Sequence, residues 1–447
     1  MFNKVLVANR GEVALRVIRA LKELGITSVA IYSQTDADSL HVLLADESYC
    51  VGPAPSPKSY LNIPSIMSVV LTSGCDAIHP GYGFMAERAD FVEICDDHNV
   101  KFIGPSAEQM RFMGDKAQAR KTMIENGVPV TPGTDLINDD DEAIKFANRV
   151  KYPVIVKATA GGGGKGMRVA ASDDELKEAL VLCRTEAQNA FGNDGVYIEK
   201  YIRNPKHIEV QIIADKFGNV CHLGERDCSI QRRHQKLIEE TPCVSIDDEL
   251  RKNICEAAVK AAKAIKYEGV GTVEFLLDKD GSWYFMEMNT RLQVEHGISE
   301  MLTGIDIVKE QIRIAAGLPL SFKQDDIVFN GHVIECRINA EDAEKGFMPC
   351  PGEISGYIAP GGFGVRVDSH VYTGYVIPPY YDSLLAKLIC WGKNREEAIA
   401  TMKRALSEYV ITNVKTTIPY HQKLIEDADF KTGNFDTSFL EKFSQRQ

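Results

Sequence analysis

The chain has 447 residues, of which 44% are hydrophobic and 26% are charged, a globular composition with material for two to four domains. Its formal net charge of -12 and its pI of about 5.4 exclude binding to nucleic acid or to an anionic membrane surface through the overall field of the protein. The sequence predicts no transmembrane helix and no export signal, and its eleven cysteines form no C-x-x-C pair, so we expect a cytoplasmic protein with reduced thiols.

The amino-terminal part predicts an α/β domain of the Rossmann-like type. Residues 4–9 are expected to form a strand, 13–24 an amphipathic helix and 29–33 the next strand. A G-x-G-x-x-G fingerprint is absent after the first strand, so a dinucleotide site is not indicated. A later strand runs into a loop of glycine and aromatic residues at 80–87, where α/β sheets place ligands. A plain tight turn is the alternative.

A run of glycines lies between two predicted strands, 153–157 and 167–170. This loop can bring several backbone N–H groups close to phosphate oxygens, and Lys157 and Lys165 add positive charge. The loop departs from the Walker A pattern, since glycine follows Lys165 where serine or threonine would hold Mg²⁺. A flexible surface loop is the alternative.

Two stretches between residues 207 and 236 combine polar groups with predicted strands. Residues 207–212 alternate strictly, so His207, Glu209 and Gln211 share one face that is either wet or functional. Residues 225–236 form a cationic island in an acidic chain, for which anion binding and a solvated surface are both open.

A β-hairpin is predicted within residues 271–289, around the dipeptide D-G at 280–281, which favours a two-residue type I′ turn. Its register brings Glu274 opposite Glu287, with Asn289 on the same face. Two carboxylates about 5 Å apart repel by about 3 kcal/mol at an effective dielectric of about 20. A divalent cation would remove this repulsion, and oxygen ligands suit Mg²⁺ or Mn²⁺. A structural or solvated pair is the alternative.

Beyond the hairpin, the pattern predicts a helix at 306–316, strands at 332–339 and 364–368 and a helix at 395–407. Glu335 and Arg337 share one face of the first of these strands.

This order of strands, glycine loop, cationic island and carboxylate hairpin resembles the ATP-grasp superfamily. Longer strings along the whole chain resemble biotin carboxylase. They are A-N-R-G-E at 8–12, H-P-G-Y-G-F at 79–84, M-G-D-K at 113–116, E-R-D-C-S at 225–229, E-M-N-T-R at 287–291 and P-P-Y-Y-D-S at 378–383.

The resemblance implies a multidomain fold of α/β and α+β type. It comprises an N-terminal α/β domain over 1–115, an ATP-grasp domain over 116–317 with a mobile lid over about 131–203, and a C-terminal α+β domain over 318–447. It also implies the reaction, in which ATP, bicarbonate and biotin give carboxybiotin, ADP and phosphate through carboxyphosphate.

The resemblance further implies roles for individual residues. Those expected to hold ATP are Lys116, Lys157, Gly163, Gly164, Glu199, Lys200, Ile202, His207, Gln231, His234, Glu274 and Glu287. Those expected to hold two ions of Mg²⁺ or Mn²⁺ are Glu274, Glu287 and Asn289. Those expected to hold bicarbonate are Lys236, Arg291, Gln293 and Val294, with Glu295 as its general base, while Arg337 stabilises the biotin enolate and Tyr82 contacts the ureido ring. The expected catalytic set is therefore Lys236, Arg291, Glu295 and Arg337.

Two positions depart from the family pattern. Gly297 follows His296 where proline is expected, which would loosen the chain next to the general base. Lys165 stands in the glycine loop where arginine is common, and it keeps the charge but loses the planar fork of donors.

The chain contains no Met-Lys-Met biotinylation sequence, so we expect biotin on a separate biotin carboxyl carrier protein and carboxyl transfer on separate carboxyltransferase subunits. The most economical context is acetyl-CoA carboxylase in fatty acid synthesis, and a subunit of a pyruvate or other acyl-CoA carboxylase is the alternative. Another ATP-grasp ligase and a catalytically silent nucleotide-binding regulator are the competing classes. The resemblance also implies a homodimer through Arg19, Glu23, Phe363 and Arg366.

Overall fold

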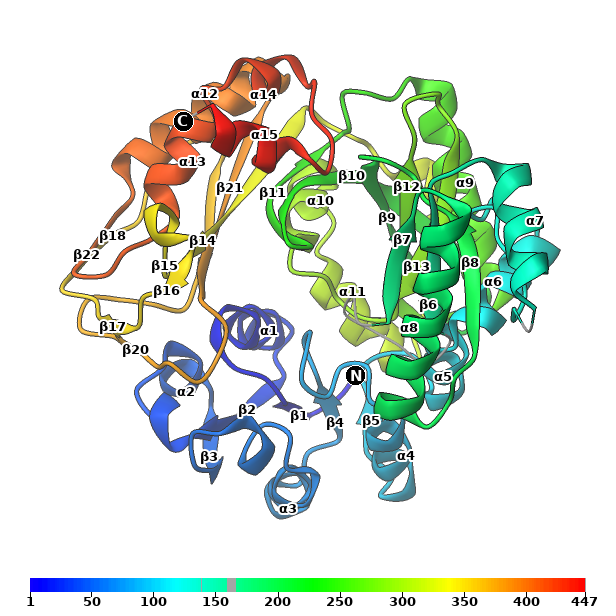
Figure 1. Ribbon diagram of the computed structural model, residues 1–447. Coiled ribbons are helices and arrows are strands. Elements are labelled where there is room, and N and C mark those ends of the chain that lie inside the picture. Colours follow the sequence, from blue (N-terminus) through cyan, green and yellow to red (C-terminus); the bar gives the residue numbers. More distant parts are fainter. Residues whose placement is uncertain (138, 159–165, 447) are drawn as a thin grey trace.

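The computed structural model describes residues 1–137, 139–158 and 166–446, and Figure 1 shows their mixed arrangement of helices and strands. The amino-terminal elements are β1 (Lys4–Val7), α1 (Gly11–Glu23), β2 (Thr27–Ser33), α2 (Leu40–Leu44), β3 (Glu47–Gly52), α3 (Ile63–Ser73), β4 (Ala77–His79), α4 (Ala89–Asp97) and β5 (Lys101–Phe102). Their strands form a parallel sheet in the order β3-β2-β1-β4-β5. Val5 and Val7 pack against α1, whereas Leu6 and Ala8 pack with α3 and α4 on the other face. Both faces are therefore buried, as parallel sheets require.

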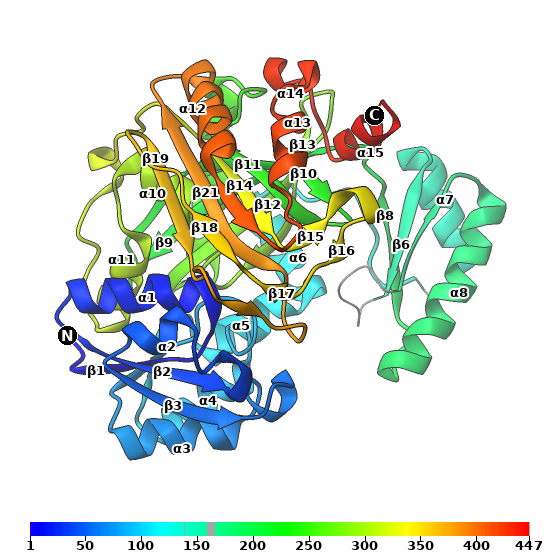
Figure 2. The same cartoon turned by 90° about the vertical axis from the view of Figure 1, so that its left-hand side faces the viewer.

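A small unit with its own hydrophobic core follows. Helices α5 (Ala107–Gly114) and α6 (Lys116–Glu125) precede it and pack with the neighbouring cores. The unit itself consists of α7 (Asp140–Val150), β6 (Val154–Ala158), β7 (Met167–Ala170), α8 (Asp173–Phe191) and β8 (Val196–Lys200). Strands β7-β6-β8 form an antiparallel sheet that packs with α7 and α8, and Figure 2 shows this unit to one side of the rest of the chain. The predicted phosphate-binding loop, with Gly163, Gly164 and Lys165, lies outside the described residues.

The largest sheet has eight strands in the order β13-β12-β9-β10-β11-β14-β21-β19. The bounds of these strands and of the neighbouring helices are β9 (Lys206–Ala214), β10 (Val220–Arg232), β11 (Gln235–Thr241), α9 (Asp248–Ala264), β12 (Gly269–Leu277), β13 (Trp283–Asn289), α10 (His296–Thr303), α11 (Ile307–Ala315), β14 (His332–Asn339), β19 (Val365–Ser369) and β21 (Leu384–Gly392). Strand β21 was not predicted from the sequence. Its residues 385–390 are all buried, so apolar and polar residues do not alternate along it.

The carboxy-terminal elements cover one face of this sheet. They are β15 (Glu341–Asp342), β16 (Met348–Pro349), β17 (Gly352–Glu353), β18 (Gly356–Ile358), β20 (Val376–Ile377), α12 (Arg395–Glu408), β22 (Val410–Thr412), α13 (Ile418–Leu424), α14 (Ala428–Thr432) and α15 (Phe439–Gln445). Ile334 and Leu388 face this layer, while Val333 and Ile389 face α10 on the opposite side. The part of the sheet that carries β14 and β21 is thus covered by helices on both faces.

The predicted carboxylate hairpin is present, but its turn differs from the expectation. The loop has three residues, 279–281, since the N–H of Asp278 donates to the carbonyl of Ser282 at 2.7 Å. A bulge between Glu274 and Phe275 compensates for this extra residue, so that Glu274 still lies opposite Glu287. The prediction of a two-residue type I′ turn was wrong, whereas the predicted pairing of Glu274 with Glu287 is confirmed.

The multidomain α/β and α+β fold predicted from the sequence is confirmed. Among the residues described, no helix is long and apolar enough to cross a membrane.

Candidate active site

Lys236, in β11, is surrounded by three buried carboxylates from separate elements. Its Nζ lies 3.2 Å from Oε1 of Glu274 on β12, 2.6 Å from Oε1 of Glu295 before α10, and also contacts Glu209 on β9. Burial opposes the ammonium charge, but the charges of the three carboxylates raise the pKa of Lys236 well above its usual value. One cation therefore holds together β9, β12 and the loop that precedes α10.

Glu295 is fully buried between cations. Its Oε1 contacts Lys236 and its Oε2 lies 2.9 Å from the guanidinium of Arg337. Burial favours the neutral carboxyl, but Lys236, Arg337 and Arg226 together hold the pKa of Glu295 well below its usual value. The sequence groups Arg291 with Lys236 at the bicarbonate site, but the third cation that lowers this pKa is Arg226. The geometry leaves Glu295 ionised at neutral pH.

Arg337 is held between two carboxylates. Its Nε donates to Oε1 of Glu239 at 2.6 Å, and its terminal nitrogen donates to Glu295. Glu239 belongs to the neighbouring strand β11, so the guanidinium is fixed from the sheet on one side and from the α10 loop on the other.

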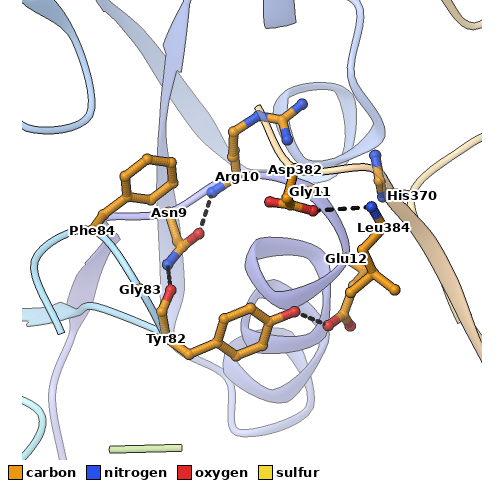
Figure 3. Close-up of a pocket in the computed structure, with 10 residues that line it drawn as sticks. All are labelled: Asn9, Arg10, Gly11, Glu12, Tyr82, Gly83, Phe84, His370, Asp382 and Leu384. Carbon is orange, nitrogen blue, oxygen red and sulfur yellow. Dashed lines mark hydrogen bonds between the residues drawn. The ribbon is translucent and has the colours of Figure 1, made fainter. Parts of the chain in front are cut away.

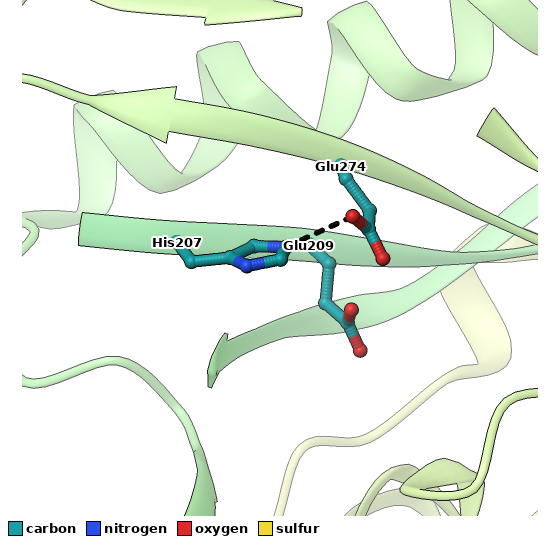
Figure 4. A group of neighbouring side chains, drawn as sticks. All are labelled: His207, Glu209 and Glu274. Carbon is teal, nitrogen blue, oxygen red and sulfur yellow. Dashed lines mark ion pairs between the residues drawn. The ribbon is translucent and has the colours of Figure 1, made fainter. Parts of the chain in front are cut away.

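His207 and Glu274 form a buried pair on adjacent strands (Figure 4). Nε2 of His207 lies 3.0 Å from Oε2 of Glu274, and the charge of Glu274 raises the pKa of His207 even though burial opposes it. Gln231, on β10, lies 3.4 Å from the other ring nitrogen of His207. These two predicted ATP-site residues thus converge on the same carboxylate hairpin.

The oxygen-rich end of the hairpin fits a divalent cation. Burial and the charge of Glu274 raise the pKa of Glu287, and no donor among the described residues contacts its carboxylate. Asn289 donates to Glu274 at 2.9 Å and adds a third oxygen-bearing side chain. His207 and Glu209 also lie near Glu274, but Glu209 is already bound by cationic partners. The carboxylate of Glu287 makes no ion pair with the described residues, so Glu274, Glu287 and Asn289 could hold a divalent cation through oxygen atoms.

Arg291 connects the loop after β13 to the amino-terminal part of the chain. Its guanidinium donates to Asn289 at 2.9 Å and to Gln293 at 3.1 Å, and its Nε lies 2.9 Å from Glu87. Tyr82, from the glycine and aromatic loop, donates its hydroxyl to Glu12. The Arg291–Glu87 contact therefore joins sequence segments about 200 residues apart.

A cavity of about 190 Å³ lies beside Tyr82 (Figure 3). Its lining residues are Asn9, Arg10, Gly11, Glu12, Tyr82, Gly83, Phe84, His370, Asp382 and Leu384. The cavity joins the predicted ligand loop of the amino-terminal sheet to the P-P-Y-Y-D-S segment, two strings that the family resemblance had singled out.

The remaining predicted ATP-site residues occupy the small unit and its borders. Lys157 lies 2.5 Å from Glu199 across β6 and β8, and Arg120 approaches the same carboxylate at 3.3 Å. Lys200 ends β8 and Ile202 is buried just beyond it, while Lys116 begins α6. His234 lies in the turn between β10 and β11 with a positive φ of 66°.

Gly297, the departure from the family pattern, lies inside α10 and not in a loop. An ideal Cβ at this position would approach Cδ1 of Ile389 to 2.5 Å. The space that a proline ring would need is therefore taken by an isoleucine side chain from β21.

Sequence reasoning missed several charged residues of this cluster. Arg226, part of the cationic island, is fully buried and bound to Glu209, so neither anion binding nor a solvated surface describes it. Lys387 lies within an apolar run of its strand and Glu239 directly follows one, and a charged residue in such a place is the signal that could have found them.

Three family models match the chain. They are described as "Biotin carboxylase, N-terminal domain" over residues 1–110, "Carbamoyl-phosphate synthase L chain, ATP binding domain" over 115–323, and "Biotin carboxylase C-terminal domain" over 335–442. Among curated relatives, biotin carboxylase 1 of Bacillus subtilis is 58% identical over 445 residues, which cover 99% of each chain. One of the pyruvate carboxylase subunits of Methanothermobacter thermautotrophicus is 55% identical over 445 residues, which cover 99% of this chain and 90% of that one.

Solved structures agree with these relatives. A biotin carboxylase complex with βγ-ATP from Campylobacter jejuni superposes with a TM-score of 0.94 at 52% identity and 99% coverage of both chains. The biotin carboxylase domain dimer of the Hydrogenobacter thermophilus 2-oxoglutarate carboxylase, bound to MgADP, ADP and bicarbonate, gives 0.92 at 51% identity and covers 100% of this chain and 98% of its own. The resemblance read from the sequence is confirmed. The chain belongs to the biotin carboxylase family of ATP-dependent carboxylases.

Proposed function

We propose that this ligase carboxylates biotin on a separate biotin carboxyl carrier protein, with ATP and bicarbonate, as the first half-reaction of an acetyl-CoA carboxylase. The observation that carries the proposal is Glu295, ionised in a buried site between Lys236 and Arg337. A second context, pyruvate carboxylase, is favoured by the relative named as part of that enzyme. The final acceptor binds to a different subunit in both cases.

Glu295 is proposed to accept the proton of bicarbonate while Lys236, Arg291, Gln293 and Val294 hold its oxygens. The cations that lower the pKa of Glu295 also weaken it as a base. Bicarbonate binding corrects this, because a second negative charge at the same cations raises the pKa of Glu295. The base thus gains strength only when its substrate is present. Deprotonated bicarbonate then attacks the γ-phosphoryl group, whose bond to the bridging oxygen of ADP breaks, to give carboxyphosphate and ADP.

The ATP end of the site is proposed to use the residues around the small unit. The set is Lys116, Lys157, Glu199, Lys200, Ile202, His207, Gln231 and His234, with Gly163 and Gly164 of the glycine loop. Glu274, Glu287 and Asn289 would hold Mg²⁺ or Mn²⁺, which neutralises charge on the transferring phosphoryl group when bound. Lys157 is proposed to exchange its bond with Glu199 for a phosphate oxygen.

Arg337 is proposed to stabilise the enolate form of biotin, with Tyr82 against the ureido ring. The guanidinium already makes a bond to Glu239 that does not involve Glu295, so it stays oriented when the carboxylate of Glu295 becomes protonated. The cavity beside Tyr82 supports access of a small ring to this end of the site.

We further infer a homodimer, carboxyltransferase partners and a cytoplasmic location. Phe363 is 87% exposed, which is unusual for a large apolar side chain, and it lies in the loop just before β19, the strand that carries Arg366. All eleven cysteines are free, in keeping with a reducing compartment. We keep the domain boundaries expected from the sequence, 1–115, 116–317 and 318–447, with the lid at about 131–203.

The proposal is tested by measuring ATP hydrolysis with and without bicarbonate and free biotin. Bicarbonate-dependent ATP cleavage that biotin stimulates is expected. A silent regulator would hydrolyse no ATP, and another ATP-grasp ligase would ignore biotin. The acceptor is tested by supplying the carboxylated carrier to carboxyltransferase subunits with acetyl-CoA or pyruvate, where transfer to pyruvate alone would replace the acetyl-CoA context.

A further inference from the structure

Lys387 is a fully buried lysine at the centre of β21. Its Nζ donates to the main-chain carbonyl of Val294 at 2.8 Å, and it lies 3.3 Å from Glu12 and 3.6 Å from Asp368. Burial disfavours its charge, but Glu12, Asp368 and Glu335 raise the pKa of Lys387, so it is an ammonium ion. A charged donor is thus aimed at one peptide group of the loop before α10.

That peptide group joins Val294 to Glu295, which are the proposed bicarbonate ligand and its proposed base. The carbonyl oxygen and the N–H of Glu295 share one rigid plane, so fixing the oxygen also fixes the direction of the Glu295 backbone. Lys387 is also the cross-strand neighbour of Arg337. Adjacent positions on β21 and β14 therefore set both the peptide at the base and the guanidinium that contacts its carboxylate.

Two features that often fix the first turn of a helix are missing at α10. Glu295 occupies the N-cap position but makes no side-chain cap, because its carboxylate is engaged by Lys236 and Arg337. Gly297, where the family pattern has proline, adds no ring constraint to the first turn of the helix. Lys387 adds a contact to the main chain of this peptide, beside those that Lys236 and Arg337 make to the Glu295 side chain.

We propose that Lys387 is a positioning residue for bicarbonate, which acts by fixing the Val294–Glu295 peptide through its main-chain carbonyl. The assignment rests on the proposed function of Glu295 and Val294. It predicts a loss confined to the use of bicarbonate, whereas a merely structural lysine would affect stability and all substrates alike.

The test compares Lys387→Met/Asp368→Asn with Asp368→Asn alone. Lys387→Met by itself leaves the buried carboxylates of Glu12 and Asp368 without this cation and is expected to fold poorly. The companion substitution therefore removes the charge of Asp368. Lys387→Arg serves as a second variant, since it keeps the charge between Glu12 and Asp368 while its wider guanidinium displaces the carbonyl. The kinetic readouts are kcat and KM for bicarbonate and for ATP in the ATP-cleavage assay.

Lys4→Met is the matched control. Lys4 makes the same kinds of contact, at 2.6 Å to Glu47 and at 2.9 Å to the carbonyl of Ser73, on a strand outside the site. It is expected to lose stability with no change in kcat/KM for bicarbonate.

For the Lys387 variants, kcat/KM for bicarbonate is expected to fall about 10- to 100-fold, the equivalent of one charged hydrogen bond, with the KM for ATP unchanged within about twofold. Folded Lys387 variants that use bicarbonate as well as their controls would overturn the assignment. A parent protein without bicarbonate-dependent ATP cleavage would overturn the proposed function and the assignment together, so the two failures are distinguishable.

Discussion

Glu239 and Glu335 lie directly opposite each other on β11 and β14, and neither is exposed to solvent. Glu239 accepts from Arg337 through one oxygen, but its second oxygen and both oxygens of Glu335 have no donor among the described residues. The charged groups that face Glu335 are Arg337, Lys387, Glu239 and Glu295. Burial and the charge of Glu239 raise the pKa of Glu335 well above its usual value, and burial raises that of Glu239 to about 7. The pair holds a proton at neutral pH.

Glu335→Gln is therefore expected to gain stability over the parent as the pH rises. A raised pKa means that the folded protein binds a proton that the unfolded chain has released, so the stability contributed by Glu335 is complete below pH of about 4.5 and is lost as the pH approaches the folded pKa. Glutamine does not titrate. Thermal unfolding at pH 5.5 and pH 8.5 should show a Tm difference that grows in favour of the variant. The underlying difference in the free energy of unfolding should grow by about 1.4 kcal/mol for each unit of pKa shift that falls within this range.

The control for this experiment is Glu93→Gln, on an exposed carboxylate whose pKa is lowered by Arg111. Because that group is ionised in both states above pH 5.5, its effect on Tm should be constant across the range. A constant Tm difference for Glu335→Gln as well would show that the buried pair carries no extra proton.

Gly297 and Ile389 are expected to be energetically coupled. Alanine in a helix is worth about 1 kcal/mol over glycine, but the new Cβ would meet Cδ1 of Ile389. Gly297→Ala should therefore gain little or destabilise in the parent and should stabilise in an Ile389→Val background, where that methyl group is absent. Urea unfolding of the four proteins of the cycle measures the coupling, expected at about 1 kcal/mol. Additive changes in the free energy of unfolding would contradict the contact.

Glu274→Gln and Glu287→Gln are expected to differ, although the two residues face each other. Glu287 makes no ion pair with the described residues, and burial and Glu274 raise its pKa despite the charges of Lys116 and His207, so its neutralisation should keep or raise the stability without nucleotide, while Mg²⁺ dependence weakens and turnover slows. Glu274 is bound to Lys236 and His207, so its neutralisation should lower the Tm. A Glu287→Gln protein that is strongly destabilised and still active would mean that the pair is structural.

Glu295→Gln and Arg337→Ala should separate the two halves of the reaction. General-base assistance is typically worth about 10² to 10⁴ in rate, so bicarbonate-dependent ATP cleavage should fall by that factor in Glu295→Gln, with ATP affinity kept. Arg337→Ala should abolish biotin carboxylation while part of the ATP cleavage survives. Identical losses in both variants would show that one role has been divided between two residues.

The pH dependence of the residual ATP cleavage gives a further check on Arg337→Ala. Arg337 is one of the cations that hold the pKa of Glu295 low, so its removal favours the neutral carboxyl. The acid limb of the kcat/KM profile for bicarbonate should move to higher pH than in the parent. A limb that stays in place would mean that Lys236 and Arg226 alone keep Glu295 ionised.

In the carboxylate hairpin, the facing pair of residues could be predicted from the sequence but the turn could not. The pairing of Glu274 with Glu287 could be predicted from alternation and a turn dipeptide, but a one-residue error in a turn reverses every face of a strand. Here the error was offset by a bulge between Glu274 and Phe275, which has no sequence signature of its own. The pair was therefore predicted correctly although the turn was predicted incorrectly.

Lys387 was missed for a different reason. Alternation identifies strands with one wet face, whereas β21 is buried on both faces and reads as a continuous apolar run with a single charge. The meeting of Lys236, Glu295 and Arg337 depends on contacts between distant segments, and the family resemblance supplied it where periodicity could not.

The eight-stranded sheet crosses the expected domain boundary between residues 317 and 318. Strand β11 lies before this boundary and β14 after it, and the two strands pair at four positions. Cutting the chain between α11 and β14 would therefore release no free-standing module. It would divide one sheet and uncover the edges of β11 and β14, each a template for pairing with other chains. The two fragments should aggregate when they are expressed separately and should reassemble when they are produced together. Residues 318–447 are therefore expected to fold as part of the shared sheet, although a separate family model matches residues 335–442.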